Sequence, residues 1–288
     1  HSILDLIKAP PAKVGGEIVF GDRNLIGLAE KEYRHVRGKQ ISMIFQEPMS
    51  AFDPLYTVGH QLMEVARAHM PWDESEARGR IIDTLKSIHI PEPDKRYNEY
   101  PHEMSGGMLQ RIMIAMALIT SPDIIIADEP TTALDVTIQA QILALMGRLQ
   151  KETGMSILFV THNLGVVAQY ADAIAVMYAG RIVETASVND LFAAPMHPYT
   201  QGLLGCLPGM TRKRELEAAA AVALRTGGKP AFVSKRRLDA IPGQVSSLLS
   251  PPPGCAFAPR CSLKLPACEA ALPGLDALNP DRWPARQA

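Results

Sequence analysis

The sequence predicts an α/β fold built on a largely parallel sheet. Short apolar runs with strand character alternate with longer segments of helical periodicity, and glycine, proline and capping residues separate them. One apolar run also ends directly in two adjacent carboxylates, Asp128 and Glu129. Because parallel strands must be joined by crossover connections, this alternation favours a parallel sheet covered by helices.

The apolar patterns assign the elements in order. Strands are expected at residues 17–20, 41–45, 123–127, 156–160 and 173–178. Helices are expected at residues 1–7, 30–37, 58–69, 74–89, 107–119, 136–153 and 164–170. Residues 73–119 therefore form a mostly helical insertion between two strands.

The composition changes after residue 206. Residues 212–224 predict a charged, alanine-rich helix, but little of residues 230–288 is periodic, and three of the four cysteines lie there. We therefore predict one domain over residues 1–206 and a separate C-terminal extension over residues 207–288.

Charge and hydropathy exclude several classes of protein. A formal net charge of -1 gives no reason to expect a nucleic-acid partner. No apolar run approaches the roughly 20 residues of a membrane-spanning helix, so a membrane role would have to come through a partner. Four cysteines without close C-x-x-C pairs indicate a reducing, cytoplasmic setting and not a secreted disulfide scaffold.

The strand that ends in Asp128 and Glu129 is the first candidate for catalysis. In phosphoryl transfer to water, one carboxylate helps to hold magnesium while another group positions or deprotonates the water. We assign Asp128 to magnesium and Glu129 to the water. Two solvated acids at a strand end are the alternative.

Three other features fit the same chemistry, although each has a structural explanation. Gln46 follows a strand and could reach a metal or water, or be an ordinary loop glutamine. His162 follows another strand and could donate to a terminal phosphate, or be structural. Ser105, Gly106 and Gly107 open a helix whose bare amides attract anions, or form only its N-cap.

The order of these features carries a family resemblance. Gln46, Ser-Gly-Gly-x-x-Gln at 105–110, the apolar run ending in Asp-Glu-Pro, Ala133-Leu134-Asp135 and Thr161-His162 follow one another along the chain. Over about residues 15–205 the sequence resembles the ATPase subunit of an ATP-binding cassette (ABC) transporter. The resemblance implies a P-loop NTPase-type ABC nucleotide-binding domain with a helical insertion subdomain and an irregular, cysteine-containing C-terminal extension.

The resemblance also implies roles for individual residues, with ATP and Mg²⁺ as cofactors. Glu129 would be the catalytic base and His162 the switch histidine, while Asp128 and Gln46 would serve magnesium. Ser105, Gly106 and Gly107 would close on the γ-phosphate of ATP held by an opposite subunit, with Gln110 just beyond them. Asp135 would belong to the loop that crosses the dimer.

The flanking motifs narrow the resemblance to dipeptide and oligopeptide importers. They are Phe45-Gln46-Glu47-Pro48, His197-Pro198-Tyr199-Thr200, Ile241-Pro242-Gly243 and Pro259-Arg260-Cys261. Importers of nickel or sugars share parts of this pattern. The implied partners are a second ATPase subunit, identical or paralogous, transmembrane permease subunits and, indirectly, an extracytoplasmic peptide-binding protein. The protein would then lie on the cytoplasmic face of the cell membrane.

The sequence departs from the family at its start. No G-x-x-x-x-G-K-[ST] phosphate loop occurs in the 288 residues. In the family that loop directly precedes a helix similar to residues 1–7. We therefore interpret the sequence as N-terminally truncated, and expect this chain to bind and hydrolyse ATP poorly by itself.

The tail cysteines leave three alternatives open. Cys255, Cys261 and Cys268 resemble part of a four-cysteine iron–sulfur site in this subfamily, but the expected fourth cysteine near the C-terminus is absent. They could hold a [4Fe–4S] cluster, bind zinc, or remain plain reduced thiols.

Two rival functions follow from the same motifs. One is a soluble ABC-type ATPase that acts on nucleic acid or ribosomes, against which the near-neutral charge and the importer-like tail argue. The other is a non-catalytic cassette that completes the ATP site of a partner, against which the intact Glu129 and His162 argue.

Overall fold

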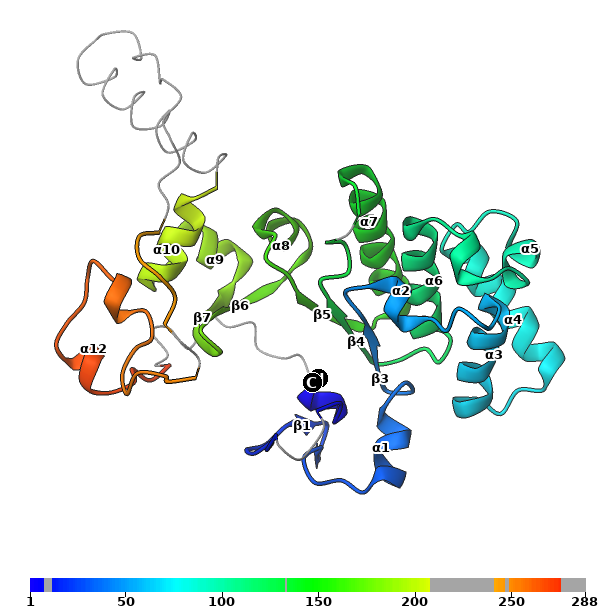
Figure 1. The fold of residues 1–288 in the computed structure, drawn as a ribbon, viewed down its shortest axis with the longest axis horizontal. Helices are drawn as coiled ribbons and strands as arrows, with labels where there is room; N and C mark the ends of the chain where they lie inside the picture. The colour runs from blue at the N-terminus through cyan, green and yellow to red at the C-terminus, as the bar shows by residue number, and fades with distance from the viewer. Residues whose placement is uncertain (8–11, 133, 208–240, 247–248, 276–288) are drawn as a thin grey trace, which may run out of the picture. The chain divides into compact units, whose positions relative to one another are not determined.

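The computed structural model describes residues 1–7, 12–132, 134–207, 241–246 and 249–275. The chain divides into two compact units between His162 and Asn163 (Figure 1). Each unit is described by itself.

The first unit contains a three-stranded parallel sheet of β3 (Ile41–Ile44), β4 (Ile124–Asp128) and β5 (Ser156–Val160), in that order. Ile41 lies opposite Ile124, and Ile124 lies opposite Ser156, so the three strands start at one level. The carboxyl ends of all three strands therefore meet at the same edge of the sheet. This arrangement confirms the predicted parallel α/β fold.

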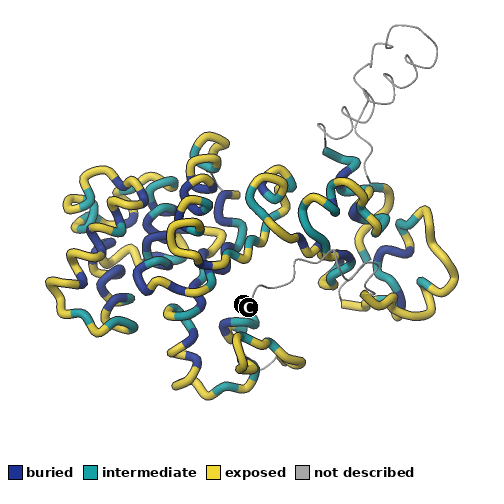
Figure 2. Tube along the Cα trace, turned by 180° about the vertical axis from the view of Figure 1, so that it is seen from behind, coloured by how far each residue is buried: buried dark blue, intermediate teal, exposed yellow. Residues whose placement is uncertain are grey.

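Helices and short strands complete the first unit. They are η1 (Ser2–Leu4), β1 (Val19–Phe20), β2 (Arg23–Asn24), α1 (Glu30–Val36), α2 (Pro48–Ala51), α3 (Val58–His69), α4 (Glu74–Ser87), α5 (Pro93–Tyr97), η2 (Pro101–Glu103), α6 (Gly106–Leu118) and α7 (Val136–Thr153). The predicted helical insertion thus comprises α4, α5, η2 and α6. Buried residues concentrate where these helices pack on one another and on the sheet (Figure 2).

Side-chain caps explain where the longer helices begin. Asp73 accepts a hydrogen bond from the Glu76 amide at 2.8 Å and starts α4. Ser105 caps α6 and Asp135 caps α7 in the same manner. Gly154 ends α7 with φ +73°, a left-handed conformation in which glycine has no steric penalty. The observed bounds of α3 and α7 match the predicted ranges.

The second unit has a separate two-stranded sheet. Its described elements are α8 (Leu164–Tyr170), β6 (Ala173–Tyr178), β7 (Arg181–Ser187), α9 (Val188–Ala193), α10 (Pro198–Gly205), η3 (Ala258–Arg260) and α12 (Ala267–Ala270). β6 was expected in the parallel sheet, but it pairs antiparallel with β7. The reason is the two-residue turn Ala179-Gly180, where both residues have positive φ (47° and 77°), as a tight hairpin requires.

Four other expectations can be compared with the structure. The helix expected over residues 1–7 is only one 3₁₀ turn, Ser2–Leu4. The helix expected over residues 212–224 lies outside the described residues. No helix in the described part of the chain is both long and apolar enough to cross a membrane. The domain boundary after residue 206 remains a prediction, since the two compact units divide earlier, after His162.

Candidate functional site

Two predicted site residues form hydrogen bonds with the carboxylate of a third at the carboxyl edge of the β3–β5 sheet. Gln46, Glu129 and His162 each follow a different strand. The amide nitrogen of Gln46 donates to Oε2 of Glu129 at 2.8 Å, and Nδ1 of His162 lies 3.0 Å from its Oε1. Because a carboxylate accepts only, that histidine nitrogen carries the proton. Residues 83 and 33 positions away in sequence therefore orient Glu129.

Thr132 is a fourth member of this cluster that the sequence analysis missed. Its hydroxyl donates to Oε2 of Glu129 at 3.0 Å. The only available signal is its position three residues after the acid, in a turn that starts with Pro130. Glu129 itself has φ +45°, and its amide donates to the Val160 carbonyl at 2.9 Å. A non-glycine residue in this region is strained, and such strain is often found at functional sites.

The cluster keeps Glu129 ionised. The hydrogen bond from His162 lowers the pKa of the Glu129 carboxyl from its ordinary value, and the bonds from Thr132 and Gln46 act in the same direction. The side chain keeps 24% of its surface exposed, so a water molecule can reach it. An ionised, oriented and accessible carboxylate is suited to accept a proton from water.

Asp128 is the last residue of β4 and lies beside this cluster in the chain. Its carboxylate is 30% exposed, and Nε2 of His1 lies 3.7 Å from Oδ2. The Asp128 carboxylate and the Gln46 amide oxygen are the type of ligand that Mg²⁺ prefers. The donor set at this edge therefore fits a magnesium ion.

A second group of predicted residues lies at the N-termini of α6 and α7. Ser105 accepts from the Met108 amide at 3.4 Å, and Asp135 accepts from the amides of Thr137 and Ile138 at 3.1 and 3.0 Å. A Cβ at Gly107 would lie 3.0 Å from Ile138, so the two helix starts lie side by side. Ser105, Gly106 and Asp135 are all exposed. Asp135 thus caps α7, and its place in a loop that crosses a dimer stays a prediction.

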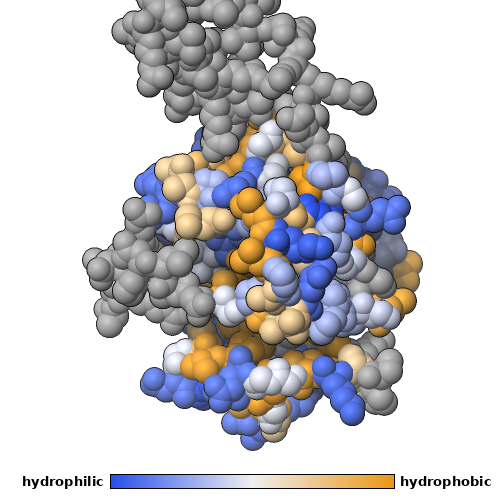
Figure 3. Space-filling model, turned by 90° about the vertical axis from the view of Figure 1, so that its left-hand side faces the viewer, coloured by the Kyte–Doolittle hydropathy of each residue, from blue (hydrophilic) through white to orange (hydrophobic). Residues whose placement is uncertain are grey.

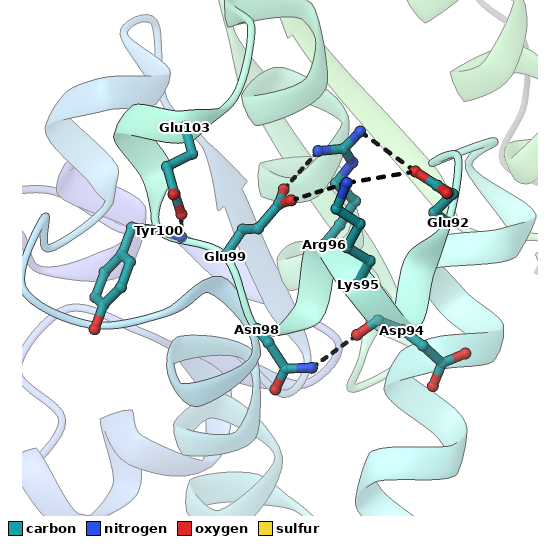
Figure 4. Close-up of polar contacts among 8 residues, drawn as sticks. All are labelled: Glu92, Asp94, Lys95, Arg96, Asn98, Glu99, Tyr100 and Glu103. Atoms are coloured by element: carbon teal, nitrogen blue, oxygen red, sulfur yellow. Dashed lines mark hydrogen bonds and ion pairs between the residues drawn. The ribbon is translucent and has the colours of Figure 1, made fainter.

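Charged pairs fix the segment that leads into Ser105 (Figure 4). Nη1 of Arg96 donates to Glu99 at 2.6 Å, and Glu103 accepts from the Tyr100 amide at 2.8 Å. The Glu99 carbonyl also accepts from the amide of Val58 at the start of α3 at 2.9 Å. These bonds connect the start of α6 to α3 and α5.

Gln110 is the most deeply buried of the predicted site residues that the structure describes. Its side chain is only 1% exposed, on the inward face of α6. Its amide nitrogen is buried without a hydrogen-bond partner among the described residues. Its assignment to cofactor binding therefore stays a prediction.

The cysteines give a correction to the predicted cofactors. Cys206, Cys255, Cys261 and Cys268 all have intermediate exposure. Among the described residues no three metal-ligating side chains gather, so the [4Fe–4S] hypothesis is not supported. The Cys255 amide instead donates to the Cys268 carbonyl at 2.7 Å, so these residues meet through their backbones. Figure 3 shows the face of the molecule on the side of α12, and apolar and polar side chains are interspersed on it.

Gln61 of α3 holds the loop that follows α2. This buried side chain accepts from the Asp53 amide and donates to the carbonyls of Asp53 and Tyr56, at 2.9, 2.9 and 3.0 Å. The loop so held presents Leu55 and Tyr56, which are 78% and 47% exposed. Sequence reasoning missed Gln61 because one glutamine within a helical pattern carries no signal of long-range bonding.

Family models and solved structures give the same assignment. The model described as "ABC transporter" matches residues 2–132, and the model "Oligopeptide/dipeptide transporter, C-terminal region" matches residues 183–227 and 228–268. The chain resembles the structure of the dimeric ATP-binding cassette MJ0796 bound to ADP and Pi, with 28% identity and a TM-score of 0.55, over 60% of this chain and 74% of the other. It also resembles cbiO1 from Clostridium perfringens, part of the ABC transporter complex cbiONQ, with 25% identity and a TM-score of 0.57, over 78% and 80% of the two chains.

Curated relatives match nearly the whole chain. A probable peptide ABC transporter ATP-binding protein of Sinorhizobium fredii is 48% identical over 97% of this chain and 78% of its own length. The dipeptide transport ATP-binding proteins DppD of Bacillus subtilis and Escherichia coli are 47% and 42% identical, over 95% and 98% of this chain and 76% and 80% of their own. The chain belongs to the ATP-binding protein family of ABC transporters, whose members are ATPases.

Proposed function

We propose that this protein is the ATP-hydrolysing subunit that energises import of di- or oligopeptides across a cell membrane. The observation that carries the proposal is the convergence of Gln46, Thr132 and His162 on the ionised carboxylate of Glu129. The peptide substrate is supported by the names of the relatives and by the match of the C-terminal region.

Glu129 acts as the general base in this proposal. The Nδ1 proton of His162 and the hydroxyl of Thr132 orient its two oxygens, which leaves the carboxylate able to accept a proton from an attacking water. Asp128 and the Gln46 amide would hold magnesium, which when bound neutralises charge on the transferred phosphate. Gln46 would contact both the magnesium ion and the general base, because its amide nitrogen already donates a hydrogen bond to Glu129.

In this proposal the residues at the N-termini of α6 and α7 contact ATP that is held by an opposite ATPase subunit. The backbone amides of Gly106, which is exposed, and Gly107, which is half-buried, lie in the first turn of a 13-residue helix, and such amides bind phosphate oxygens. We assign Ser105, Gly106 and Gly107 to the γ-phosphate of ATP held by an opposite ATPase subunit, and Asp135 to the same interface. Two subunits would then enclose two ATP molecules between them.

The exposed segment after Gln46 is the proposed contact with the permease. Met49, Leu55 and Tyr56 are 53%, 78% and 47% exposed, and Gln61 fixes the loop in position. Apolar side chains on a fixed loop suit a packed helix of a transmembrane permease. The protein would then be peripheral on the cytoplasmic face of the membrane. An extracytoplasmic peptide-binding protein would act on it only through the permease.

The test is transport by the assembled complex in vesicles. ATP hydrolysis is measured with the peptide-binding protein and a dipeptide, an oligopeptide, nickel or a sugar in turn. We expect stimulation by peptides only, accompanied by uptake, and loss of both in Glu129→Gln. Stimulation of ATP hydrolysis by nickel or a sugar and not by peptides would overturn the proposed peptide substrate. Hydrolysis that needs RNA or ribosomes would overturn the transport function itself.

A further inference from the structure

The first unit contains an open cavity of about 520 Å³ that the ATPase function does not use. Arg23 of β2 and two neighbouring helical and loop segments surround it; the lining residues are Arg23, Lys31, Glu32, His35, Lys39 and Gln40. Gln40 directly precedes β3, so the cavity lies at the amino end of that strand. Gln46 and Glu129 lie at the carboxyl edge of the same sheet. The cavity is therefore a different place from the catalytic cluster.

Positive charge exceeds negative charge in the lining of this cavity. Arg23, Lys31 and Lys39 form no ion pair in the part of the chain that the structure describes. Glu32 is the only carboxylate of the lining, and its Oε2 already accepts from the Ala29 amide at 3.2 Å. By contrast, Arg34 and Arg37, which do not line the cavity, both pair with Glu30, at 3.8 and 3.1 Å.

One neighbouring group is consistent with this excess of cations. Burial, and after it the charge of Lys39, lowers the pKa of His69. The lining thus presents guanidinium and ammonium donors together.

We propose that this cavity binds a small phosphate-bearing anion. A phosphate group has several acceptor oxygens and no obligatory donor, which matches a set of N–H donors with net positive charge. Inorganic phosphate would leave most of the volume empty, but a nucleoside monophosphate or a short inorganic phosphate chain fits a cavity of this size. Both of these ligands carry the phosphate group that the cavity would recognise. The proposal concerns binding only and does not rest on peptide transport.

The experiment is equilibrium binding to the protein, with AMP and pyrophosphate titrated separately at constant ionic strength. Lys31→Gln and Arg34→Gln are the matched pair, because both remove one cation from α1 and only Lys31 lines the cavity. We expect one saturable site per chain that is weakened about fivefold or more by Lys31→Gln and hardly at all by Arg34→Gln, which corresponds to about 1 kcal/mol. Lys31→Gln combined with Lys39→Gln should weaken it further.

Three results would overturn the proposal. They are no saturable binding of either probe, equal weakening by Lys31→Gln and Arg34→Gln, and loss of binding in Asp128→Asn. The second result would indicate general surface charge, and the third would place the probe at the catalytic edge. Tighter binding of AMP than of pyrophosphate would support a nucleotide as the source, and the reverse would support an inorganic phosphate chain. The outcome is independent of the transport assay.

Discussion

The side chains of Glu129 in the first unit and Arg260 in the second each form hydrogen bonds with three polar partners. The partners of Glu129 are all side chains, those of Gln46, Thr132 and His162. Arg260 donates instead to the backbone carbonyls of Pro242 and Ile241 at 2.7 and 2.8 Å, and to the Tyr178 hydroxyl at 3.2 Å.

This difference distinguishes a site from a structural cross-link. Side-chain partners around an accessible carboxylate orient that group for chemistry. Backbone carbonyls bound by Arg260 fix the course of residues 241–242 against β6. Phe257 reinforces the cross-link, since its ring lies 5.2 Å from that of Tyr178 and 5.5 Å from that of Tyr199. We therefore expect substitutions at Glu129 to affect activity and substitutions at Arg260 to affect stability.

Glu129→Gln should give the largest effect. In the assembled transport complex, loss of a positioned general base should lower the rate of ATP hydrolysis by about 10²- to 10⁴-fold, whereas ATP binding and the thermal unfolding midpoint should stay close to wild type. The closed dimer should accumulate, because binding is kept and hydrolysis is lost. Glu74→Gln, on the exposed surface of α4, is the control and should hydrolyse ATP normally. Unchanged turnover in Glu129→Gln would refute the assigned base.

Arg260→Met should affect the stability of the protein and not its ATP hydrolysis. The substitution removes three hydrogen bonds and leaves two carbonyls without their donor, so the free energy of unfolding should fall by about 2–3 kcal/mol in urea denaturation. Lys264→Met is the matched control. Its exposed pair with Glu269 should contribute less than about 1 kcal/mol. Normal stability with lost hydrolysis in Arg260→Met would reverse the comparison.

Gln61→Leu tests an intermediate case, in which a buried side chain fixes an exposed loop. The loss of three hydrogen bonds to the loop should destabilise the protein by about 1–2 kcal/mol. Amide exchange of residues 53–57 should accelerate more than that of α3 itself. Equal protection of this loop in the variant would show that Gln61 does not hold it.

His197 provides a smaller, pH-dependent effect in the second unit. Burial lowers its pKa below the ordinary value of 6.5, although the nearby Glu184 acts in the opposite direction. The folded state therefore binds fewer protons than the unfolded state, and stability should fall as the pH drops below about 6.5. His197→Asn keeps an acceptor for the Tyr199 amide but does not titrate, so its stability should fall less over this range. Parallel curves for both proteins would exclude His197 as the cause.

The sequence predicted the site better than it predicted the pairing of strands. Gln46, Glu129 and His162 could be placed together because each follows a strand of a parallel sheet, whose carboxyl ends share one edge. Thr132 could not, because its contact depends on the turn geometry after Pro130. The antiparallel pairing of β6 with β7 was missed because an apolar run is compatible with either sheet.

The sequence by itself determined the local elements and the family. Apolar periodicity and the caps Asp73, Ser105 and Asp135 act over a few residues, so a reader of the chain can find them. Only the tertiary structure decided which side chains meet. It buried Gln110, left the cysteines without a common centre among the described residues, and collected unpaired cations before β3. Such contacts depend on packing between segments distant in sequence, which no local pattern specifies.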